Sequence, residues 1–183
     1  MAEITLLDGG MGQELVHRAG DRPTPLWSTQ VMVDHPGMVE AVHRDFVAAG
    51  ATVATCNSYA IHRDRLIGTG MEDRFADLHA MAIAEAKAAG AKRIGGSIGP
   101  LGASYRADVM PDHAESVAKF KEVASQLAPH VDVIQCETVV SVAHTKALME
   151  ALDGIGKPVW MAFTVSDRDG TMLRSGEPLS DAV

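Results

Sequence analysis

The sequence has little of what marks several large classes of protein. It contains only two cysteines, Cys56 and Cys136, too few for the disulfide frameworks of small secreted domains. No apolar run approaches the roughly 20 residues that cross a bilayer. Residues 1–4 show neither the basic region nor the long apolar core of a secretory signal. These absences predict a reduced, cytoplasmic protein with no membrane partner.

Positive charge is also scarce. The chain has 16 basic and 24 acidic residues, a formal net charge of −8, and its Lys and Arg residues form no cluster. A nucleic-acid partner is therefore not expected, because such binding depends on a concentrated positive surface. No Cys-x-x-Cys or His-Glu-x-x-His spacing occurs, and Leu15 stands where the third glycine of a dinucleotide-binding turn belongs. The eight histidines are scattered, and we assign none of them to a metal or to catalysis.

Short apolar runs alternate with longer amphipathic stretches along the chain. The pattern predicts strands at 4–7, 52–55, 93–98, 131–136 and 159–164. It predicts helices at 12–19, 37–49, 72–89, 114–127 and 142–152, and the start of another at 179–183. Gly20, Gly50 and Gly90 are expected to end helices, and Asp112 and Ser141 to cap them. A proline-rich loop with Pro23, Pro25 and Trp27 follows the first helix.

This alternation predicts an α/β fold with about five βα units and a parallel sheet. Two architectures satisfy it: an open doubly wound sheet, or a (β/α)₈ barrel that is incomplete in this chain. A full barrel typically needs about 250 residues, so 183 residues leave room for five or six of its eight units. We expect residues 1–183 to be one portion of a single domain.

Two carboxylates stand at the ends of predicted strands that lie far apart in the sequence. Asp8 follows the strand at 4–7, and Glu137 follows the strand at 131–136. The carboxyl ends of parallel strands meet at one face, where active sites are built, so both carboxylates are expected at one site. Two carboxylates suit a cationic group such as an amine. Taken alone, Asp8 has the alternative of capping a glycine-rich turn, and Glu137 that of a solvated loop residue.

Polar and aromatic residues near other strand ends extend this candidate site. Asn57 and Tyr59 belong to a polar cluster after the second strand, and Trp27 lies in the proline-rich loop. Trp27 and Tyr59 suit an aromatic box for a cationic ligand, with simple packing as the alternative. The small residues at 95–100 fit an inward-facing barrel strand better than a ligand-binding loop. Cys56 and Cys136 are expected to be buried structural residues.

Together these motifs resemble the N-terminal part of the homocysteine S-methyltransferase family, over nearly the whole chain. The similarity depends on the order and spacing of several short segments: LDGGMGQEL at 7–15, PLWS at 25–28, HRDF at 43–46, AGA at 49–51, TCNSY at 55–59, GSIGP at 96–100, CET at 136–138, KPVW at 157–160 and LRSGEPL at 173–179. The resemblance implies a (β/α)₈ barrel that transfers a methyl group from a methylated sulfonium or ammonium donor to homocysteine, giving methionine. It implies small-molecule substrates as partners.

The resemblance also implies roles for particular residues. It places a substrate-binding set around the amino-acid end of homocysteine and a methyl-donor pocket beside it. The substrate-binding residues are Asp8, Gly9, Gly10, Asn57, Glu137 and Thr138, and the methyl-donor pocket holds Trp27 and Tyr59. In the family, zinc bound by three cysteines activates the thiol, since a metal-bound thiol is deprotonated. Those cysteines lie in Gly-x-Asn-Cys-like and Gly-Gly-Cys-Cys-like motifs, which this chain lacks.

Two hypotheses follow. In the first, the full-length protein is a zinc-dependent methyltransferase, and this chain carries no catalytic residue or metal ligand of its own. In the second, the chain is a non-catalytic binding or assembly module. Its first and last strands would then be open edges that pair with a second copy or with a complementing C-terminal half.

Overall fold

The computed structural model describes residues 4–20, 24 and 26–183, so Pro23 and Pro25 of the predicted loop lie outside it. Four parallel strands form one sheet in the order β1-β2-β3-β4. They are β1 (Val53–Thr55), β2 (Arg93–Ile98), β3 (Val133–Val139) and β4 (Val159–Phe163). The prediction of β2 is confirmed at both ends, and the predictions of β1 and β4 are each one residue too long. β3 begins and ends later than predicted.

The predicted first strand, 4–7, is wrong as a continuous strand but right in its position. Leu7 forms a single parallel bridge with Val53. Hydrogen bonds from Thr52 N to Leu6 O (2.8 Å) and from Asp8 N to Val53 O (3.1 Å) flank that bridge. Ile4 is 88% exposed and Leu6 is 51% exposed, so the start of the segment buries little apolar surface. The segment therefore lies next to β1 as a fifth, single-bridge member of the row of strands.

The longer helices lie close to their predicted bounds. They are α1 (Met11–Ala19), α3 (Met38–Ala48), α5 (Phe75–Ala88), α6 (His113–Leu127) and α7 (Val142–Ala151). The predicted caps are confirmed, because Asp112 accepts from Glu115 N and Ser141 accepts from His144 N. Gly20 ends α1 in the left-handed region, at φ 67°.

Several short elements differ from the prediction. The first turn of the helix predicted at 72–89 is a 3₁₀ turn, Glu72–Arg74, and the helix start predicted at 179–183 is a 3₁₀ turn at Leu179–Asp181. Periodicity did not reveal α2 (Ser28–Asp34), α4 (Arg63–Leu66) or the 3₁₀ turn Ala107–Val109, because each is too short to show a repeating apolar face. None of the described helices is both long and apolar enough to span a bilayer.

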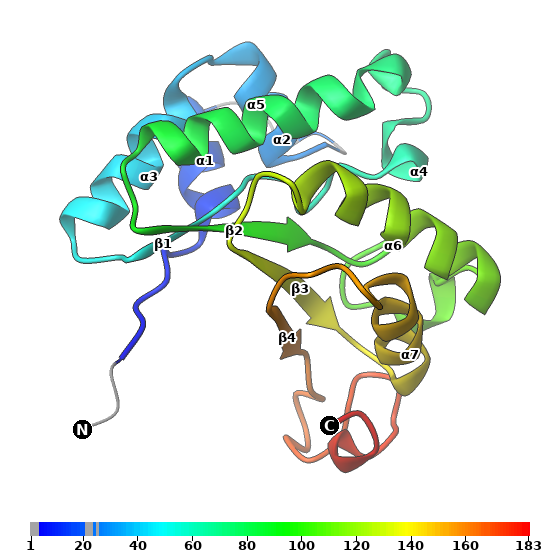
Figure 1. The fold of residues 1–183 in the computed structure, drawn as a ribbon. Coiled ribbons are helices and arrows are strands. Elements are labelled where there is room, and N and C mark those ends of the chain that lie inside the picture. The colour runs from blue at the N-terminus through cyan, green and yellow to red at the C-terminus, as the bar shows by residue number, and fades with distance from the viewer. Residues whose placement is uncertain (1–3, 21–23, 25) are drawn as a thin grey trace.

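The strand order decides between the two predicted architectures. Strand order follows chain order without reversal, whereas a doubly wound sheet reverses at a switch point. Figure 1 shows the helices gathered on one side of a curved row of strands, the arrangement found in the wall of a (β/α)₈ barrel. The chain is thus part of a (β/α)₈ barrel.

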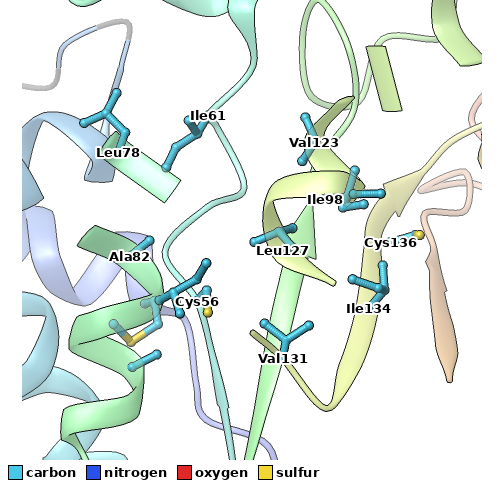
Figure 2. Close-up of a cluster of buried hydrophobic side chains, with 14 of the residues drawn as sticks. Cys56, Ile61, Leu78, Ala82, Ile98, Val123, Leu127, Val131, Ile134 and Cys136 are labelled. Atoms are coloured by element: carbon cyan, nitrogen blue, oxygen red, sulfur yellow. The ribbon is translucent and has the colours of Figure 1, made fainter. Parts of the chain in front are cut away.

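The hydrophobic core fills the layer between the strands and the helices. Figure 2 shows Ile98 and Ile134 on the strands facing Val123, Leu127 and their neighbours. These residues are buried and belong to one continuous cluster. Strand β2 can approach α6 closely because its residue 96 is glycine. A Cβ on Gly96 would lie 3.1 Å from Leu127 Cβ. This packing holds the carboxyl ends of the strands in fixed positions.

Candidate functional site

The carboxyl ends of the strands surround a cavity of about 760 Å³. Its volume lies within the range of small-molecule sites. All eight residues of the predicted substrate and methyl-donor sets line it: Asp8, Gly9, Gly10, Trp27, Asn57, Tyr59, Glu137 and Thr138. Residues more than 100 positions apart in the sequence therefore meet at one cavity, as the strand-end argument predicted. Their functional roles remain predictions.

Backbone strain gathers at the same cavity. The described non-glycine residues with positive φ are Trp27 (48°), Tyr105 (64°) and Thr138 (57°), and all three line the cavity. This region is costly for bulky and β-branched side chains. Strained backbone that is concentrated at one cavity is typical of a functional site.

Asp8 is held by several hydrogen bonds at the base of the cavity wall. Thr55 donates to it twice, from its backbone N (2.7 Å) and from Oγ1 (2.7 Å), and His43 Nδ1 lies 3.1 Å from Oδ2. The Asp8 and His43 side chains are almost fully buried. Asp8 does not cap α1, because the N-cap is Gly10 and no side chain bonds there. The carboxylate thus ties the first βα turn to β1 and α3 while keeping one edge on the cavity.

Glu137 is less well supplied with partners. Ser97 Oγ donates to its Oε1 at 2.7 Å. Burial raises the pKa of the Glu137 carboxyl, the hydrogen bond from Ser97 lowers it, and the charge of Asp8 raises it further. A buried carboxylate with a raised pKa and a second carboxylate nearby favours a cation. An ammonium ion in the cavity would supply that missing charge.

A hydrogen-bond network links three loops around the cavity. The Tyr59 hydroxyl donates to Thr138 Oγ1 (3.0 Å) and shares a hydrogen bond with Ser104 Oγ (2.8 Å). Asn57 Nδ2 donates to Ser28 O at 3.0 Å, which ties the end of β1 to the start of α2. These bonds orient the Tyr59 ring at the cavity wall.

Two glycines allow aromatic rings to close the first βα turn. A Cβ on Gly12 would lie 2.3 Å from Trp27 Cη2, and a Cβ on Gly9 would lie 2.6 Å from Phe46 Cε1. Any larger residue would displace these rings. The glycine-rich turn is therefore needed for packing as well as for exposing backbone N–H groups.

The cysteines do not fit a zinc site. Burial raises the pKa of Cys56 to about 12 and that of Cys136 to about 12, and neither thiol belongs to a group of possible metal ligands among the described residues. Figure 2 places both in the hydrophobic cluster, as predicted. Within the described part of the chain, no three His, Cys, Asp or Glu side chains group as metal ligands do.

Some cavity residues escaped the sequence argument. Ser97 lies on β2 and Gln135 on β3, each two residues along its strand from another inward-facing residue. Because side chains alternate between the two faces of a strand, this spacing could have predicted that both line the cavity. His43, which we assigned no role, lies behind the cavity wall on α3, where its Nδ1 is 3.1 Å from Asp8 Oδ2. Tyr105 and Trp160 also line the cavity, and we predicted a site role for neither.

Comparisons with known proteins identify relatives of this chain. The chain is 32% identical over 202 residues to the homocysteine S-methyltransferase of Escherichia coli (strain K12), covering 99% of this chain and 64% of that protein. It is 26% identical to homocysteine S-methyltransferase YbgG of Bacillus subtilis (strain 168), covering 97% of this chain and 63% of that protein. The chain thus spans less than two thirds of these curated relatives.

A solved structure shows the same fold. The metallated form of the homocysteine methyltransferase MmuM from Escherichia coli matches with a TM-score of 0.87 and 29% identity, over 99% of this chain and 69% of that one. A family model described as homocysteine S-methyltransferase matches residues 5–183. The chain therefore belongs to the homocysteine S-methyltransferase family.

Proposed function

We propose that residues 1–183 form the N-terminal portion of a single (β/α)₈ domain that methylates homocysteine. The reaction breaks the bond between the methyl carbon and the sulfonium sulfur or ammonium nitrogen of the donor. It forms a new bond between that methyl carbon and the sulfur of homocysteine. The thiol proton is released, and methionine is the product. The observation that carries the proposal is the pair of carboxylates, Asp8 and Glu137, at one cavity whose described lining includes no Lys, Arg or His.

Homocysteine would lie with its ammonium group between these carboxylates. Glu137 is the stronger partner, because it accepts one hydrogen bond from the protein whereas Asp8 already has Thr55 and His43. The turn at Gly9 and Gly10, at the uncapped start of α1, suits the substrate carboxylate, since helix N-termini bind anions. Asn57 and Thr138 complete this side of the cavity.

The methyl donor would lie against Trp27 and Tyr59. Aromatic faces attract sulfonium and quaternary ammonium groups, which carry charge but cannot donate strong hydrogen bonds. The bonds of Tyr59 to Thr138 and Ser104 hold its ring in place for this contact.

For the metal we propose zinc. The support is the metallated form of the Escherichia coli relative. Zinc would deprotonate the homocysteine thiol, and its ligands would come from outside the described residues, since these contain no suitable group. The role of this chain is then to bind and orient both substrates.

The proposal is tested by calorimetric binding of homocysteine and by methionine formation from S-methylmethionine or betaine. We expect Glu137→Gln to weaken homocysteine binding about 10- to 100-fold, because a hydrogen bond to a charged group contributes about 1.5–3 kcal/mol. Glu115→Gln is the matched control, because Glu115 pairs with Lys119 on the surface of α6. Equal binding by both variants would contradict the proposal.

A second candidate function is a non-catalytic assembly module. Within the described residues β4 pairs only with β3, so one edge of the sheet is open. A second copy or a complementing C-terminal half would cover that edge. Sedimentation velocity tests this candidate, since a monomer at high concentration with measurable methyl transfer would reject it.

A further inference from the structure

Gln135 is a buried polar side chain that the proposed substrate contacts leave unexplained. It lies on β3, lines the cavity and is 6% exposed. Its Nε2 is buried and has no hydrogen-bond partner among the described residues. Buried amide groups are nearly always hydrogen-bonded, so an unpartnered one that faces a cavity is available to donate to a ligand there.

The neighbouring strand makes room for this carboxamide. A Cβ on Gly95 would lie 2.8 Å from Gln135 Cδ and 2.9 Å from Nε2. Any other residue at 95 would displace the amide from its position. The glycine is therefore required for the conformation of Gln135.

Gln135 and Glu137 present their side chains to the same cavity from one strand. Residues two apart on a strand point to the same face, with Cα atoms about 6.6 Å apart. Two side chains of equal length at that spacing can hold the two ends of an α-amino-acid head group between them. Glu137 suits the ammonium, which leaves the carboxylate for Gln135.

The cavity has few other groups for a carboxylate. None of its described lining residues is cationic. Of its amide side chains, Asn57 already donates to Ser28 O, and Gln13 is exposed. A carboxylate must therefore be bound by neutral donors, and the Gln135 amide is the one side-chain amide here that is both buried and unpartnered.

We infer that Gln135 is a further substrate-binding residue, whose amide N–H donates to the carboxylate of the amino-acid substrate. This inference rests on the proposed function, because it takes homocysteine as the ligand. It adds a side-chain donor to the backbone donors of the first βα turn.

The test is a cycle of two ligands and three variants, measured by calorimetry in the full protein. The ligands are homocysteine and 3-aminopropane-1-thiol, which is the same molecule without its carboxylate. Gln135→Met keeps the length of the side chain and removes its donor, and Gln135→Glu adds a negative charge. Gln126→Met on α6 is the matched control, because Gln126 does not line the cavity.

We expect Gln135→Met to bind homocysteine about 10- to 100-fold more weakly and the decarboxylated ligand with unchanged affinity. Gln135→Glu should weaken homocysteine further, because two carboxylates would then meet. Circular dichroism checks that each variant folds.

Three outcomes overturn the inference. Equal loss for both ligands would mean a structural role for Gln135, and tighter binding by Gln135→Glu would mean that Gln135 faces the ammonium. Unchanged homocysteine binding by Gln135→Met would reject the contact and leave the proposed function standing. Failure of the unsubstituted protein to bind homocysteine would overturn the proposed function and this inference together.

Discussion

Two regions of the molecule bury polar side chains, and they do so in opposite ways. At the cavity, Asp8 and Glu137 are carboxylates held by hydrogen bonds from neighbouring strands. In the helical layer three histidines are almost fully buried: His62 and His144 lie against Phe120, and His79 lies against Phe75. The cavity carboxylates are fixed by polar contacts, whereas the histidines pack mainly as aromatic core residues.

Burial disfavours the charged form in both regions, so it raises the pKa of Glu137 and lowers the pKa values of the three histidines. Burial, together with the smaller effect of the Arg65 charge, lowers the pKa of His62 to about 3. Burial lowers the pKa of His79 to about 4 and that of His144 to about 4. His79 Nδ1 lies 2.8 Å from Phe75 O, whereas His79 Nε2 and His144 Nδ1 have no partner among the described residues. A histidine in a sequence is thus a weak sign of chemistry, and its partners decide its role.

Lowering the pH should give the largest difference between the two regions in their contribution to the free energy of unfolding. The three histidines have lower pKa values folded than unfolded, so the unfolded chain takes up protons first. Their contribution is complete above the unfolded value of about 6.5 and is lost as the pH falls towards 4. Each lowers the free energy of unfolding by about 1.4 kcal/mol per pH unit in that window. Urea unfolding at pH 7, 6 and 5 measures this, and His144→Leu should remove about a third of the slope. An unchanged slope would contradict it.

Glu137 should respond to pH with the opposite sign. Its folded pKa is raised, so its contribution to stability is present below the unfolded value and lost as the pH rises through the folded one. Glu137→Gln should therefore stabilise the fold at pH 7, with the gain disappearing below about pH 4.5. If Glu137→Gln is more stable at pH 7 and also binds homocysteine more weakly, then Glu137 lowers the stability of the fold while contributing to substrate binding. Lower stability at pH 7 would mean that the charged carboxylate is already well paired.

Phe120→Ala should damage the helical layer without changing the cavity. Phe120 is fully buried, stacked on His144 (5.3 Å between ring centroids) and edge-on to His62 (6.4 Å). Truncating a buried phenylalanine costs about 3–5 kcal/mol of unfolding free energy. Urea unfolding measures the loss, with Phe120→Leu as a milder control. Homocysteine binding by the folded fraction should be unchanged, and a loss of affinity would mean that the two regions are coupled.

Tyr59→Phe should have the smallest effect, and at the cavity alone. It removes the hydroxyl that bonds Thr138 and Ser104 but keeps the aromatic face. We expect a loss of about 1 kcal/mol in stability and weaker methyl-donor binding, because the ring is less well oriented. Urea unfolding and a donor titration test this. A donor affinity equal to that of the unsubstituted protein would mean that packing alone positions the ring.

The sequence predicted long elements well and short ones poorly. Helix α6 and its Asp112 cap follow from a long apolar period and a capping residue, both of them local features. The single bridge at Leu7 depends on a partner strand 46 residues away, which local pattern cannot reveal. The resemblance to the family was confirmed by the comparisons. The roles of Asp8, Glu137 and the aromatic pair remain predictions, although the structure brings these residues to one cavity.

The sequence by itself determined the α/β alternation, the family and the strand-end positions of Asp8 and Glu137, because these depend on residue type and spacing along the chain. Only the tertiary structure decided that strand order runs without reversal and that Trp27, Tyr105 and Thr138 are strained at one cavity. It also decided that Gly95 makes room for an unpartnered Gln135. The physical reason is that these features arise between side chains from different strands, and their distances are fixed only when the sheet curves and the core packs.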